Sequence, residues 1–306
     1  MYEKIIIPGD VPRGARGAFH NNYHAITQHN GRLLLFAADH KIEHLNADFY
    51  GEGIAPEALN PHHLFEIAGK AQVGAFATQL GLITRYGYLY PQVNYIAKLN
   101  AKTDLIKTEQ HDPISEQLWT VDDVMAVQKN TGLNIRGVGC TLYLGSVYEE
   151  AMLAQAAEII FDAHQRGLIA TLWIYLRGKA IADDQAPELI AGAAGIANAL
   201  GADFVKVKPP MQQGENSAQL LSIAAQAAGN TKLICSGGKR VEVKHLLQEV
   251  YNQIHTGSAA GCATGRNIFQ RPLPEAVALC KALAALIYEN KEVNSAFEVY
   301  AGYLKK

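Results

Sequence analysis

The segment Ala202–Pro210, which reads ADFVKVKPP, has the pattern of a short buried β-strand. Phe204 and the two valines favour a strand, and the paired prolines end it because proline cannot donate to a sheet ladder. Side chains alternate along a strand, so Lys206 and Lys208 share one face with Phe204. A lysine on such a face either reaches solvent at the strand end or serves as a desolvated nucleophile, and this segment alone leaves both open.

Seven further apolar runs resemble this strand, and helical segments separate most of them. In chain order the eight runs are Leu33–His40, Val73–Gln79, Tyr95–Asn100, Ile135–Tyr143, Ile169–Arg177, Asp203–Lys208, Lys232–Ser236 and Ala259–Thr264. Helices that alternate with strands indicate parallel strands joined by crossovers. Eight such units in about 250 residues predict an α/β fold of the (β/α)8 TIM-barrel type, and a doubly wound open sheet is the alternative.

Polar residues follow many of these strands, which favours the barrel over an open sheet with one switch point. They are Asp39, Lys98, Asn100, Tyr143, Tyr175, Arg177, Lys206, Ser236 and Arg266. A TIM barrel keeps its active site at the carboxyl ends of its strands. We therefore expect these side chains to surround a single site.

Two sequence patterns predict where helices begin. Ser146 with Glu149 matches an S-x-x-E capping box and predicts a helix that continues to about Arg166. Thr120 with Asp123 is a weaker match to the same box.

Length and composition are typical of a soluble globular chain. The 306 residues are 49% hydrophobic, enough for a large core, and carry a formal net charge of -2. We expect residues 1–306 to form a single TIM-barrel domain, with an N-terminal extension at 1–30, the barrel at about 32–290 and a helical tail at about 291–306. The four scattered cysteines contain no CxxC pair, which argues against a zinc ribbon or a disulfide framework.

The same composition bears on partners and compartment. Basic residues are scattered, whereas a nucleic acid or an anionic membrane would call for a clustered basic face. The sequence shows neither the apolar core of a secretory signal nor an apolar run of membrane length. We therefore expect a cytoplasmic protein that binds neither nucleic acid nor membrane, and whose anionic partner is small.

The polar and aromatic side chains of the fifth predicted strand alternate with aliphatic ones. They are Thr171, Trp173, Tyr175 and Arg177. If the aliphatic residues face the helices, this set faces the barrel axis. Tyr175 would then lie near Lys206 and could move protons as a carbinolamine becomes an imine, although a core tyrosine with its hydroxyl bonded elsewhere fits the same pattern.

Two glycine-rich loops follow the seventh and eighth predicted strands. The first contains Ser236, Gly237 and Gly238, and the second contains Gly265 and Arg266. Glycine lets backbone N–H groups approach an anion, helix N-termini add a favourable dipole, and arginine can fork onto two oxygen atoms. Either loop alone could be a tight turn, but phosphate commonly binds between these two loops of a TIM barrel, so together they predict a phosphate site.

Residues 40–44 read HKIEH and match the H-x-x-E-H pattern of some zinc peptidases. Zinc ligands there share one helical face, whereas this motif directly follows an apolar strand, so we expect no metal site and no cofactor. Asp39 is better placed to hold a substrate hydroxyl or to tune a neighbouring lysine, although it would also suit a turn cap.

With these motifs assembled, the chain resembles the archaeal-type class I fructose-bisphosphate aldolases, a DhnA-like group that also occurs in bacteria and is related to deoxyribose-phosphate aldolase. The likeness extends from about Arg32 to Gln270. Its matching pieces, in strand order, are ADHKIEH, KLN, VGCTLYLGS, LWIYLRG, ADFVKVK, SGG and GRNIFQ. Many short motifs in the same order are more specific than any one of them.

The resemblance implies a role for each candidate residue. It places the Schiff-base lysine at Lys206 rather than Lys208, the acid/base tyrosine at Tyr175 and the strand-one aspartate at Asp39. The residues expected to bind substrate or its phosphates are Ser236, Gly237, Gly238, Gly265, Arg266, Trp173, Arg177 and Lys208. The resemblance further implies a metal-independent reaction, a phosphorylated sugar substrate and a homo-oligomer.

A free amine on Lys206 near neutral pH requires its pKa to fall by about three units from the ordinary value. We expect burial to lower the pKa, with help from the positive charge of Lys208 and of Lys98 or Arg177.

Two positions depart from the family pattern. Residues 209–214 read PPMQQG where many members have a Y-T-G-D-like loop, and Lys41 stands where many have glycine. The predicted reaction is reversible aldol cleavage of a ketose phosphate, and fructose 1,6-bisphosphate is the expected substrate. A related aldol, transaldol or thiolase-type transfer on another phosphorylated keto compound also fits, and so does a non-enzymatic sugar-phosphate sensor, which would need no buried amine.

Overall fold

The computed structural model describes residues 5–43, 48–106, 112–212 and 215–305. Within them eight strands form a closed barrel in the order β1-β12-β11-β8-β7-β6-β3-β2, and neighbouring strands are parallel. The strands are β1 (Leu33–Ala37), β2 (Ala75–Gln79), β3 (Tyr95–Lys98), β6 (Ile135–Leu144), β7 (Ile169–Leu176), β8 (Phe204–Val207), β11 (Lys232–Ser236) and β12 (Gly261–Thr264). Each overlaps one predicted run, so the TIM-barrel prediction is confirmed and the open sheet is excluded.

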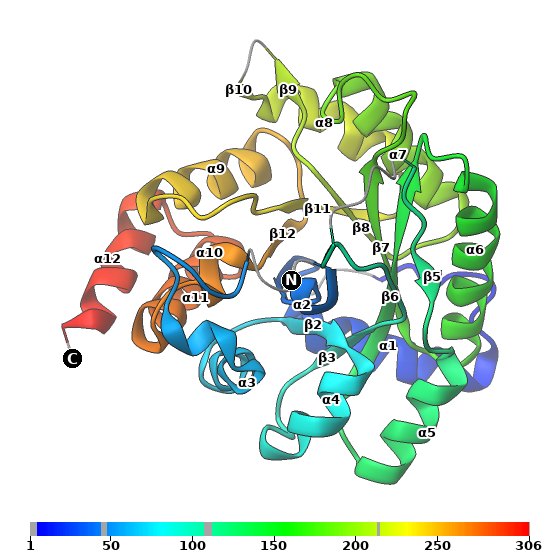
Figure 1. Ribbon diagram of the computed structural model, residues 1–306, viewed down its shortest axis with the longest axis horizontal. Helices are drawn as coiled ribbons and strands as arrows, with labels where there is room; N and C mark the ends of the chain where they lie inside the picture. The colour runs from blue at the N-terminus through cyan, green and yellow to red at the C-terminus, as the bar shows by residue number, and fades with distance from the viewer. Residues whose placement is uncertain (1–4, 44–47, 107–111, 213–214, 306) are drawn as a thin grey trace.

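Helices surround the barrel, as Figure 1 shows. They are α3 (Pro61–Lys70), α4 (Leu80–Tyr86), α5 (Val121–Thr131), α6 (Glu149–Gln165), α7 (Pro187–Ala199), α8 (Ala218–Ala227), α9 (Val243–His255), α10 (Arg266–Phe269) and α11 (Leu273–Ile287). The last helix, α12 (Val293–Leu304), packs on α9 and α11, where Phe297 and Tyr300 are partly buried while Leu304 is exposed. The predicted helical tail is therefore a layer outside the barrel.

Alternation along the strands divides the core into two clusters. Leu172, Ile174 and Leu176 of β7 point to the cluster between strands and helices, whereas Trp173 and Tyr175 belong to the cluster inside the barrel. This is the arrangement predicted for the fifth strand. It follows from the period of two residues along a strand.

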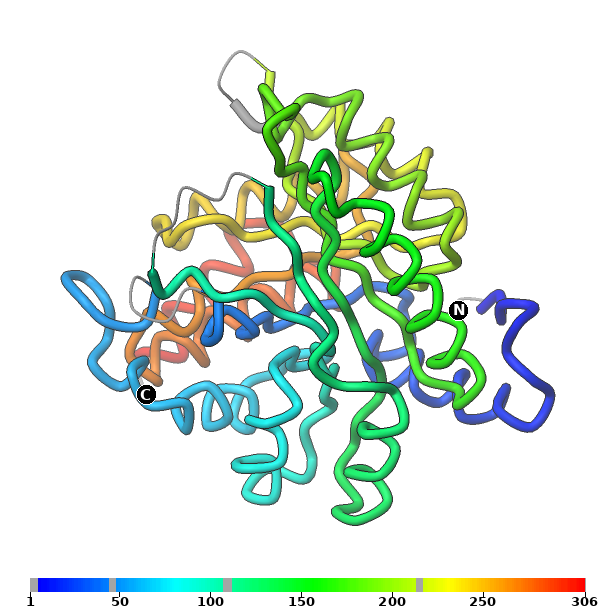
Figure 2. Tube along the Cα trace, turned by 45° about the vertical axis from the view of Figure 1, so that its right-hand side comes forward, coloured from blue at the N-terminus to red at the C-terminus, as the bar shows by residue number. Residues whose placement is uncertain are grey.

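The N-terminal extension closes one end of the barrel. Its helix α1 (Arg16–Thr27) buries Phe19 and Tyr23 against the interior cluster, and the Tyr23 ring stacks on Phe204 with centroids 5.8 Å apart. Because Phe204 is the first residue of β8, the described part of the extension forms a floor at the amino-terminal ends of the strands. In Figure 2 the N-terminal segment and the C-terminus lie on opposite sides of the molecule.

A buried histidine ties this floor to the barrel. His164 on α6 contacts Asp10 through Nδ1 (2.8 Å to Oδ2) and Asp203 through Nε2 (3.2 Å to Oδ2). Burial alone would lower the pKa of His164, but the hydrogen bonds and charges of Asp203 and Asp10 outweigh it and raise the pKa to about 8. At neutral pH both ring nitrogens therefore donate.

The two capping-box predictions have different outcomes. Thr120 and Asp123 form a complete box at the start of α5. The Ser146 prediction is wrong, because α6 begins at Glu149 and Ser146 Oγ accepts from Tyr148 N (3.2 Å). Glu149 instead accepts from Gly145 N (2.5 Å), in a turn where Gly145 has a φ of 89°.

Two smaller findings complete the fold. None of the helices in the described ranges has the length and apolar character needed to cross a membrane. The four cysteines are buried and free.

Candidate active site

A cavity of about 380 Å³ opens at the carboxyl ends of the strands. The predicted site residues that line it are Asp39, Tyr175, Arg177, Lys206, Lys208, Ser236, Gly237, Gly238, Gly265 and Arg266. The structure thus brings together residues that are up to 227 positions apart, from Asp39 to Arg266. Trp173 is not part of the cavity wall, because its indole is buried inside the barrel, below the mouth.

Lys206 is buried in the wall of this cavity. It lies on β8 with Trp173 of β7 and Ile234 of β11 as its Cα partners, and it is only 3% exposed. Burial lowers the pKa of Lys206, Asp39 opposes this and Lys98 adds to it, so that the pKa is about 8. About one tenth of Lys206 is therefore a free amine at pH 7, and about half of it at pH 8.

The cations that lower the pKa of Lys206 differ in part from those predicted. Lys98, which was predicted, and Arg266, which was not, both lower it. Lys208 instead forms an ion pair with Asp184, which compensates its charge.

Tyr175 lines the cavity from the end of β7. Its ring stacks on Tyr143 with centroids 6.4 Å apart. Burial raises the pKa of the Tyr175 phenol far above its ordinary value, and the charges of Asp39 and Glu43 raise it further. The hydroxyl therefore stays protonated and can donate a hydrogen bond or a proton.

Asp39 lies just beyond the end of β1 and is 4% exposed. Burial would raise the pKa of its carboxyl, but the charges of Lys98, His40 and Lys206 outweigh this and lower the pKa to about 2. Asp39 is therefore an anion throughout the neutral range. An ionised carboxylate beside a protonated phenol divides the acceptor and donor roles between Asp39 and Tyr175.

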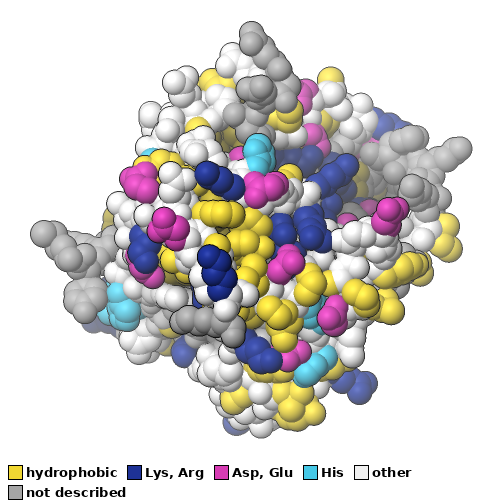
Figure 3. Space-filling view, turned by 90° about the vertical axis from the view of Figure 1, so that its left-hand side faces the viewer, with side chains coloured by type: hydrophobic (Ala, Val, Ile, Leu, Met, Phe, Trp, Pro, Cys, Tyr) yellow, Lys and Arg dark blue, Asp and Glu magenta, His cyan; other side chains and the backbone are white. Residues whose placement is uncertain are grey.

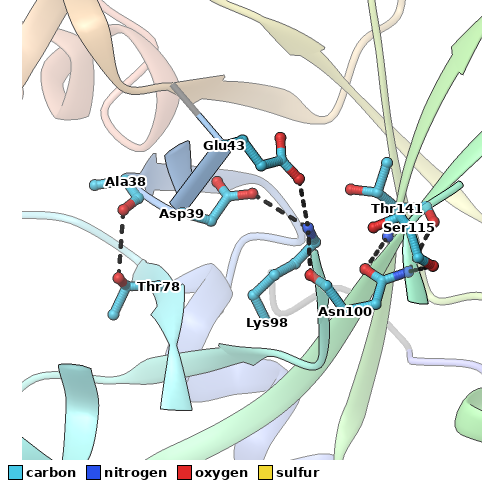
Figure 4. A network of polar contacts seen from close by, with 8 residues as sticks. All are labelled: Ala38, Asp39, Glu43, Thr78, Lys98, Asn100, Ser115 and Thr141. Carbon is cyan, nitrogen blue, oxygen red and sulfur yellow. Dashed lines mark hydrogen bonds and ion pairs between the residues drawn. The ribbon is translucent and has the colours of Figure 1, made fainter. Parts of the chain in front are cut away.

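Two charged residues near Asp39 were given no catalytic or binding role from the sequence, although Lys98 was expected at the site as a strand-end residue. Lys98 of β3 is fully buried, and its Nζ lies 3.5 Å from Asp39 Oδ2 and 3.8 Å from Glu43 Oε1 (Figure 4). The alternation rule that placed Lys206 on the interior face of its strand also places Lys98 there, two residues after the interior Ile96. No sequence signal pairs Lys98 with Glu43, because they come from different elements.

The loops after β11 and β12 pack so closely on neighbouring strands that only glycine fits at positions 237 and 265. A Cβ on Gly237 would lie 2.2 Å from Thr264 Oγ1, and a Cβ on Gly265 would lie 2.1 Å from the carbonyl oxygen of Ala37. Gly238 has a φ of 63°, a conformation that glycine adopts without strain. These loops therefore expose backbone at the cavity wall, as anion binding requires.

Asn267 locks the two loops together. Its Nδ2 donates to the carbonyl oxygens of Gly237 (2.6 Å) and Lys239 (2.9 Å), and its Oδ1 accepts from Val241 N (2.9 Å). The helix that follows Gly265, α10, has only four residues, so its dipole would favour a bound anion less than predicted. Anion binding here would rest on the backbone of the loops and on Arg266, whose Nη1 lies 3.6 Å from Asp48 Oδ1.

The HKIEH motif is split between two environments. His40 and Glu43 of α2 (His40–Glu43) line the cavity, whereas Lys41 turns away and donates to the carbonyl oxygen of Leu59 (2.6 Å). His44 lies outside the described residues. Among the residues that the structure describes, no three His, Cys, Asp or Glu side chains are grouped as metal ligands.

The loop that departs from the family pattern also reaches the cavity. Pro209 and Met211 line it, and Met211 belongs to a two-stranded sheet of β9 (Met211–Gln212) and β10 (Glu215–Asn216). Gln213 and Gly214 lie outside the described residues.

Comparisons with known proteins place the chain in a family. A model described as "DeoC/LacD family aldolase" matches residues 33–271. The fructose-bisphosphate aldolase/6-deoxy-5-ketofructose 1-phosphate synthase of Methanocaldococcus jannaschii is 48% identical over 97% of this chain and 95% of its own length. A solved fructose-bisphosphate aldolase from Slackia heliotrinireducens matches with a TM-score of 0.95 and 51% identity, covering 98% of this chain and 94% of that one.

A further solved structure is an archaeal fructose-1,6-bisphosphate aldolase whose catalytic lysine is covalently bound to the carbinolamine intermediate of the substrate. It matches with a TM-score of 0.75 and 31% identity, over 88% of this chain and 99% of that one. From the family match over most of the barrel and from these relatives, the chain belongs to the DeoC/LacD family of aldolases.

Proposed function

We propose that this chain is a class I aldolase that reversibly cleaves fructose 1,6-bisphosphate to dihydroxyacetone phosphate and glyceraldehyde 3-phosphate. The observation that carries the proposal is the Lys206 amine, which is buried at the cavity wall with a pKa of about 8. The names of the relatives, fructose-bisphosphate aldolases, support the choice of reaction and substrate.

The first half of the reaction forms the imine. Lys206 Nζ attacks the C2 ketone and gives a carbinolamine. Tyr175 then donates its phenolic proton to the carbinolamine hydroxyl, which leaves as water and generates an iminium ion. A phenol whose pKa is raised by burial keeps its proton until this step needs it.

The second half breaks the carbon–carbon bond. Asp39 accepts the proton of the C4 hydroxyl, the C3–C4 electron pair moves into the iminium to form an enamine, and glyceraldehyde 3-phosphate leaves. Asp39 then returns its proton to C3 of the enamine. Water hydrolyses the resulting iminium and restores the proton of Tyr175, which releases dihydroxyacetone phosphate and regenerates Lys206. In this scheme Asp39 and Tyr175 move the protons, and the iminium serves as the electron sink.

The cavity offers two positive regions for the two phosphate groups. Gly237, Gly238 and Gly265 with Arg266 would hold one phosphate through backbone N–H groups and the guanidinium. Arg177 would meet the other, and its guanidinium lies 5.9 Å from the ring centroid of Tyr143. Lys208 contributes less than a free lysine would, because Asp184 compensates its charge.

A second reaction on the same imine is favoured by one observation. The 48% identical relative carries a second activity in its name, 6-deoxy-5-ketofructose 1-phosphate synthase. The enamine on Lys206 would, in such a transfer, add to a different carbonyl acceptor instead of being protonated. A panel of aldehyde and ketone acceptors, each offered with fructose 1,6-bisphosphate, would distinguish cleavage alone from cleavage with transfer.

The experiment that tests the proposed function is reductive trapping. The protein is treated with dihydroxyacetone phosphate and sodium cyanoborohydride, with and without EDTA, and the modified peptide is mapped by mass spectrometry. We expect an EDTA-insensitive adduct on Lys206. An adduct on Lys208 or Lys98 would correct the residue, and binding of sugar phosphates without any adduct would favour a sensor.

The proposal extends to the setting of the enzyme. We propose that residues 1–306 form one domain that acts in the cytoplasm as a homo-oligomer on phosphorylated sugars, without nucleic acid or membrane as a partner. On the face drawn in Figure 3, basic and acidic side chains are interspersed, which agrees with a net charge of only -2. Light scattering behind size-exclusion chromatography would test the oligomer, and a monomer at working concentration would contradict it.

A further inference from the structure

Lys98 is a fully buried lysine that contacts two carboxylates at the mouth of the barrel. Its Nζ lies 3.5 Å from Asp39 Oδ2 and 3.8 Å from Glu43 Oε1 (Figure 4). Both carboxylates line the cavity, whereas Lys98 does not. Burying an ammonium group is costly unless it is paired, so these contacts explain how Lys98 is tolerated. They also mean that Lys98 acts on bound substrate only through its neighbours.

The position of the Lys98 ammonium group is set by the backbone. Nζ donates to the carbonyl oxygen of Asn100 (3.2 Å). The Asn100 side chain accepts from Thr141 N (2.7 Å) and donates to the carbonyl oxygens of Thr141 (2.9 Å) and Ser115 (3.1 Å). Figure 4 shows this chain of contacts leading from Lys98 to the neighbouring elements. The charge of Lys98 is thus held in place before any substrate binds.

Lys98 and Lys206 lie near the same indole. Lys98 Nζ is 5.5 Å and Lys206 Nζ 6.0 Å from the ring centroid of Trp173. Both lysines also interact with the charge of Asp39. Without Lys98, that charge would be compensated by Lys206 and His40. A Lys206 ammonium held by Asp39 would be a poor nucleophile, because it must lose its proton to attack a ketone.

Charged and titratable groups from several elements surround Lys206. Those whose charge acts on it, or that line the same cavity near it, include Asp39, His40, Glu43, Lys98, Tyr175, Cys262 and Arg266. Asp39 has a pKa of about 2, and burial raises the pKa of Cys262 to about 12 and that of Tyr175 further still. Asp39, Cys262 and Tyr175 therefore keep their charge between pH 6 and 10. His40 also lines the cavity and interacts with Asp39, and imidazole can change its charge in this range, so the midpoint of each variant is compared with that of the wild type.

We propose that Lys98 is a positioning residue for Schiff-base formation: by engaging Asp39 and Glu43, it prevents either carboxylate from holding Lys206 as an ammonium ion. This inference rests on the proposed function, since it concerns the same amine. A purely structural Lys98, present only to neutralise two buried carboxylates, would leave the protonation of Lys206 unchanged. The pH dependence of imine formation separates the two roles.

The experiment measures the initial rate of cyanoborohydride trapping with dihydroxyacetone phosphate from pH 6 to 10, by intact mass. Lys98→Met is expected to move the midpoint of the rise with pH by about one unit to higher pH, because Asp39 then retains the proton on Lys206. At pH 7 this corresponds to a roughly tenfold lower trapping rate. Lys98→Arg keeps the positive charge and is expected to restore most of the shift.

Glu43→Gln should shift the midpoint of the trapping rate in the opposite direction. This variant leaves Lys98 paired with Asp39. It removes a negative charge that favours the ammonium form of Lys206, so the midpoint should move to lower pH. Lys41→Met is the matched control, because Lys41 donates to the carbonyl oxygen of Leu59 and does not line the cavity. Its midpoint should stay at the wild-type value.

The outcomes separate this inference from the proposed function. Opposite shifts for Lys98→Met and Glu43→Gln would support it. Unchanged midpoints in folded variants, or shifts in the same direction, would overturn it while the wild type still forms its adduct. If Lys98→Met does not fold, a midpoint of Glu43→Gln below the wild-type value together with a midpoint of Lys98→Arg near the wild-type value would support the inference, and any other result would overturn it. A wild-type chain without any Lys206 adduct would overturn the proposed function and this inference with it.

Discussion

At the amino-terminal end of the barrel His164 lies between Asp10 and Asp203, and at the carboxyl-terminal end Lys98 lies between Asp39 and Glu43. At the floor both contacts are direct hydrogen bonds of 2.8 and 3.2 Å. At the mouth the contacts are longer, 3.5 and 3.8 Å. The same arrangement of a cation between two carboxylates therefore occurs at both ends with different geometry.

The difference lies in what else each cluster faces. The floor cluster joins the extension to the barrel, where Asp203 also accepts from Ala170 N (2.8 Å). The mouth cluster faces a cavity that contains a second buried lysine, Lys206, with a pKa of about 8. We infer that the floor uses its charges for stability, whereas the mouth uses them to keep an amine reactive. Substitutions at the floor should therefore change the free energy of unfolding, whereas substitutions at the mouth should change activity.

The largest effect is expected from Lys206→Met. Removal of the amine abolishes the imine, so kcat/KM should fall by about 10⁴-fold or more while the protein still folds. Steady-state assays with fructose 1,6-bisphosphate, together with circular dichroism, would check both points. Lys208→Met is the comparison variant, and it should retain the trapped adduct on Lys206. A Lys206→Met variant with appreciable turnover would refute the assignment.

Tyr175→Phe should have a smaller effect at the same end of the barrel. Loss of the phenolic proton should lower kcat by about 10²- to 10³-fold, because general acid catalysis contributes that much. The imine should form more slowly, because Tyr175 protonates the leaving hydroxyl, but an adduct should still accumulate on Lys206, which remains. Tyr143→Phe, which changes the ring stacked on Tyr175, is the matched control and should reduce kcat less. A near-normal rate constant for Tyr175→Phe in a single-turnover assay would exclude a role of Tyr175 in proton transfer.

The smallest effect on activity is expected from His164→Gln at the floor, where stability should change instead. The pKa of His164 is raised from 6.5 to about 8 in the folded state, so the cation stabilises the fold below about pH 6.5 and this contribution is lost as the pH rises through 8. The maximum contribution is about 2 kcal/mol.

Urea denaturation of the wild type and of His164→Gln at pH 6 and pH 9 would measure the contribution of the His164 charge to the free energy of unfolding. The variant should lose more stability at pH 6 than at pH 9, and its trapping profile should match that of the wild type. Equal losses at both pH values would show that the charge of His164 is not the cause. A displaced trapping profile would contradict the separation of the two ends.

Much of the barrel could be predicted because its strands are short and apolar and alternate with helices. The period of two residues placed Trp173 and Tyr175 inside the barrel and Leu172 and Ile174 outside it. The Ser146 prediction was wrong for a local reason. The chain makes a turn at Gly145 after β6, so α6 begins later than the capping box requires.

The sequence by itself determined the strands, the side of each strand that faces the axis and the glycine loops, because these depend on local periodicity and on residue type. The choice of Lys206 over Lys208 came from the resemblance to the aldolase family, because both lysines share one face of the strand. Only the tertiary structure decided the partners of each charge. Lys98, Asp39 and Glu43 come from β3, the end of β1 and α2, and they meet because β1 and β3 flank β2 in the barrel. The folded barrel also pairs Lys208 with Asp184 and buries Lys206. The protonation of the amine depends on burial and on charges from several elements, and these are set only when the barrel closes.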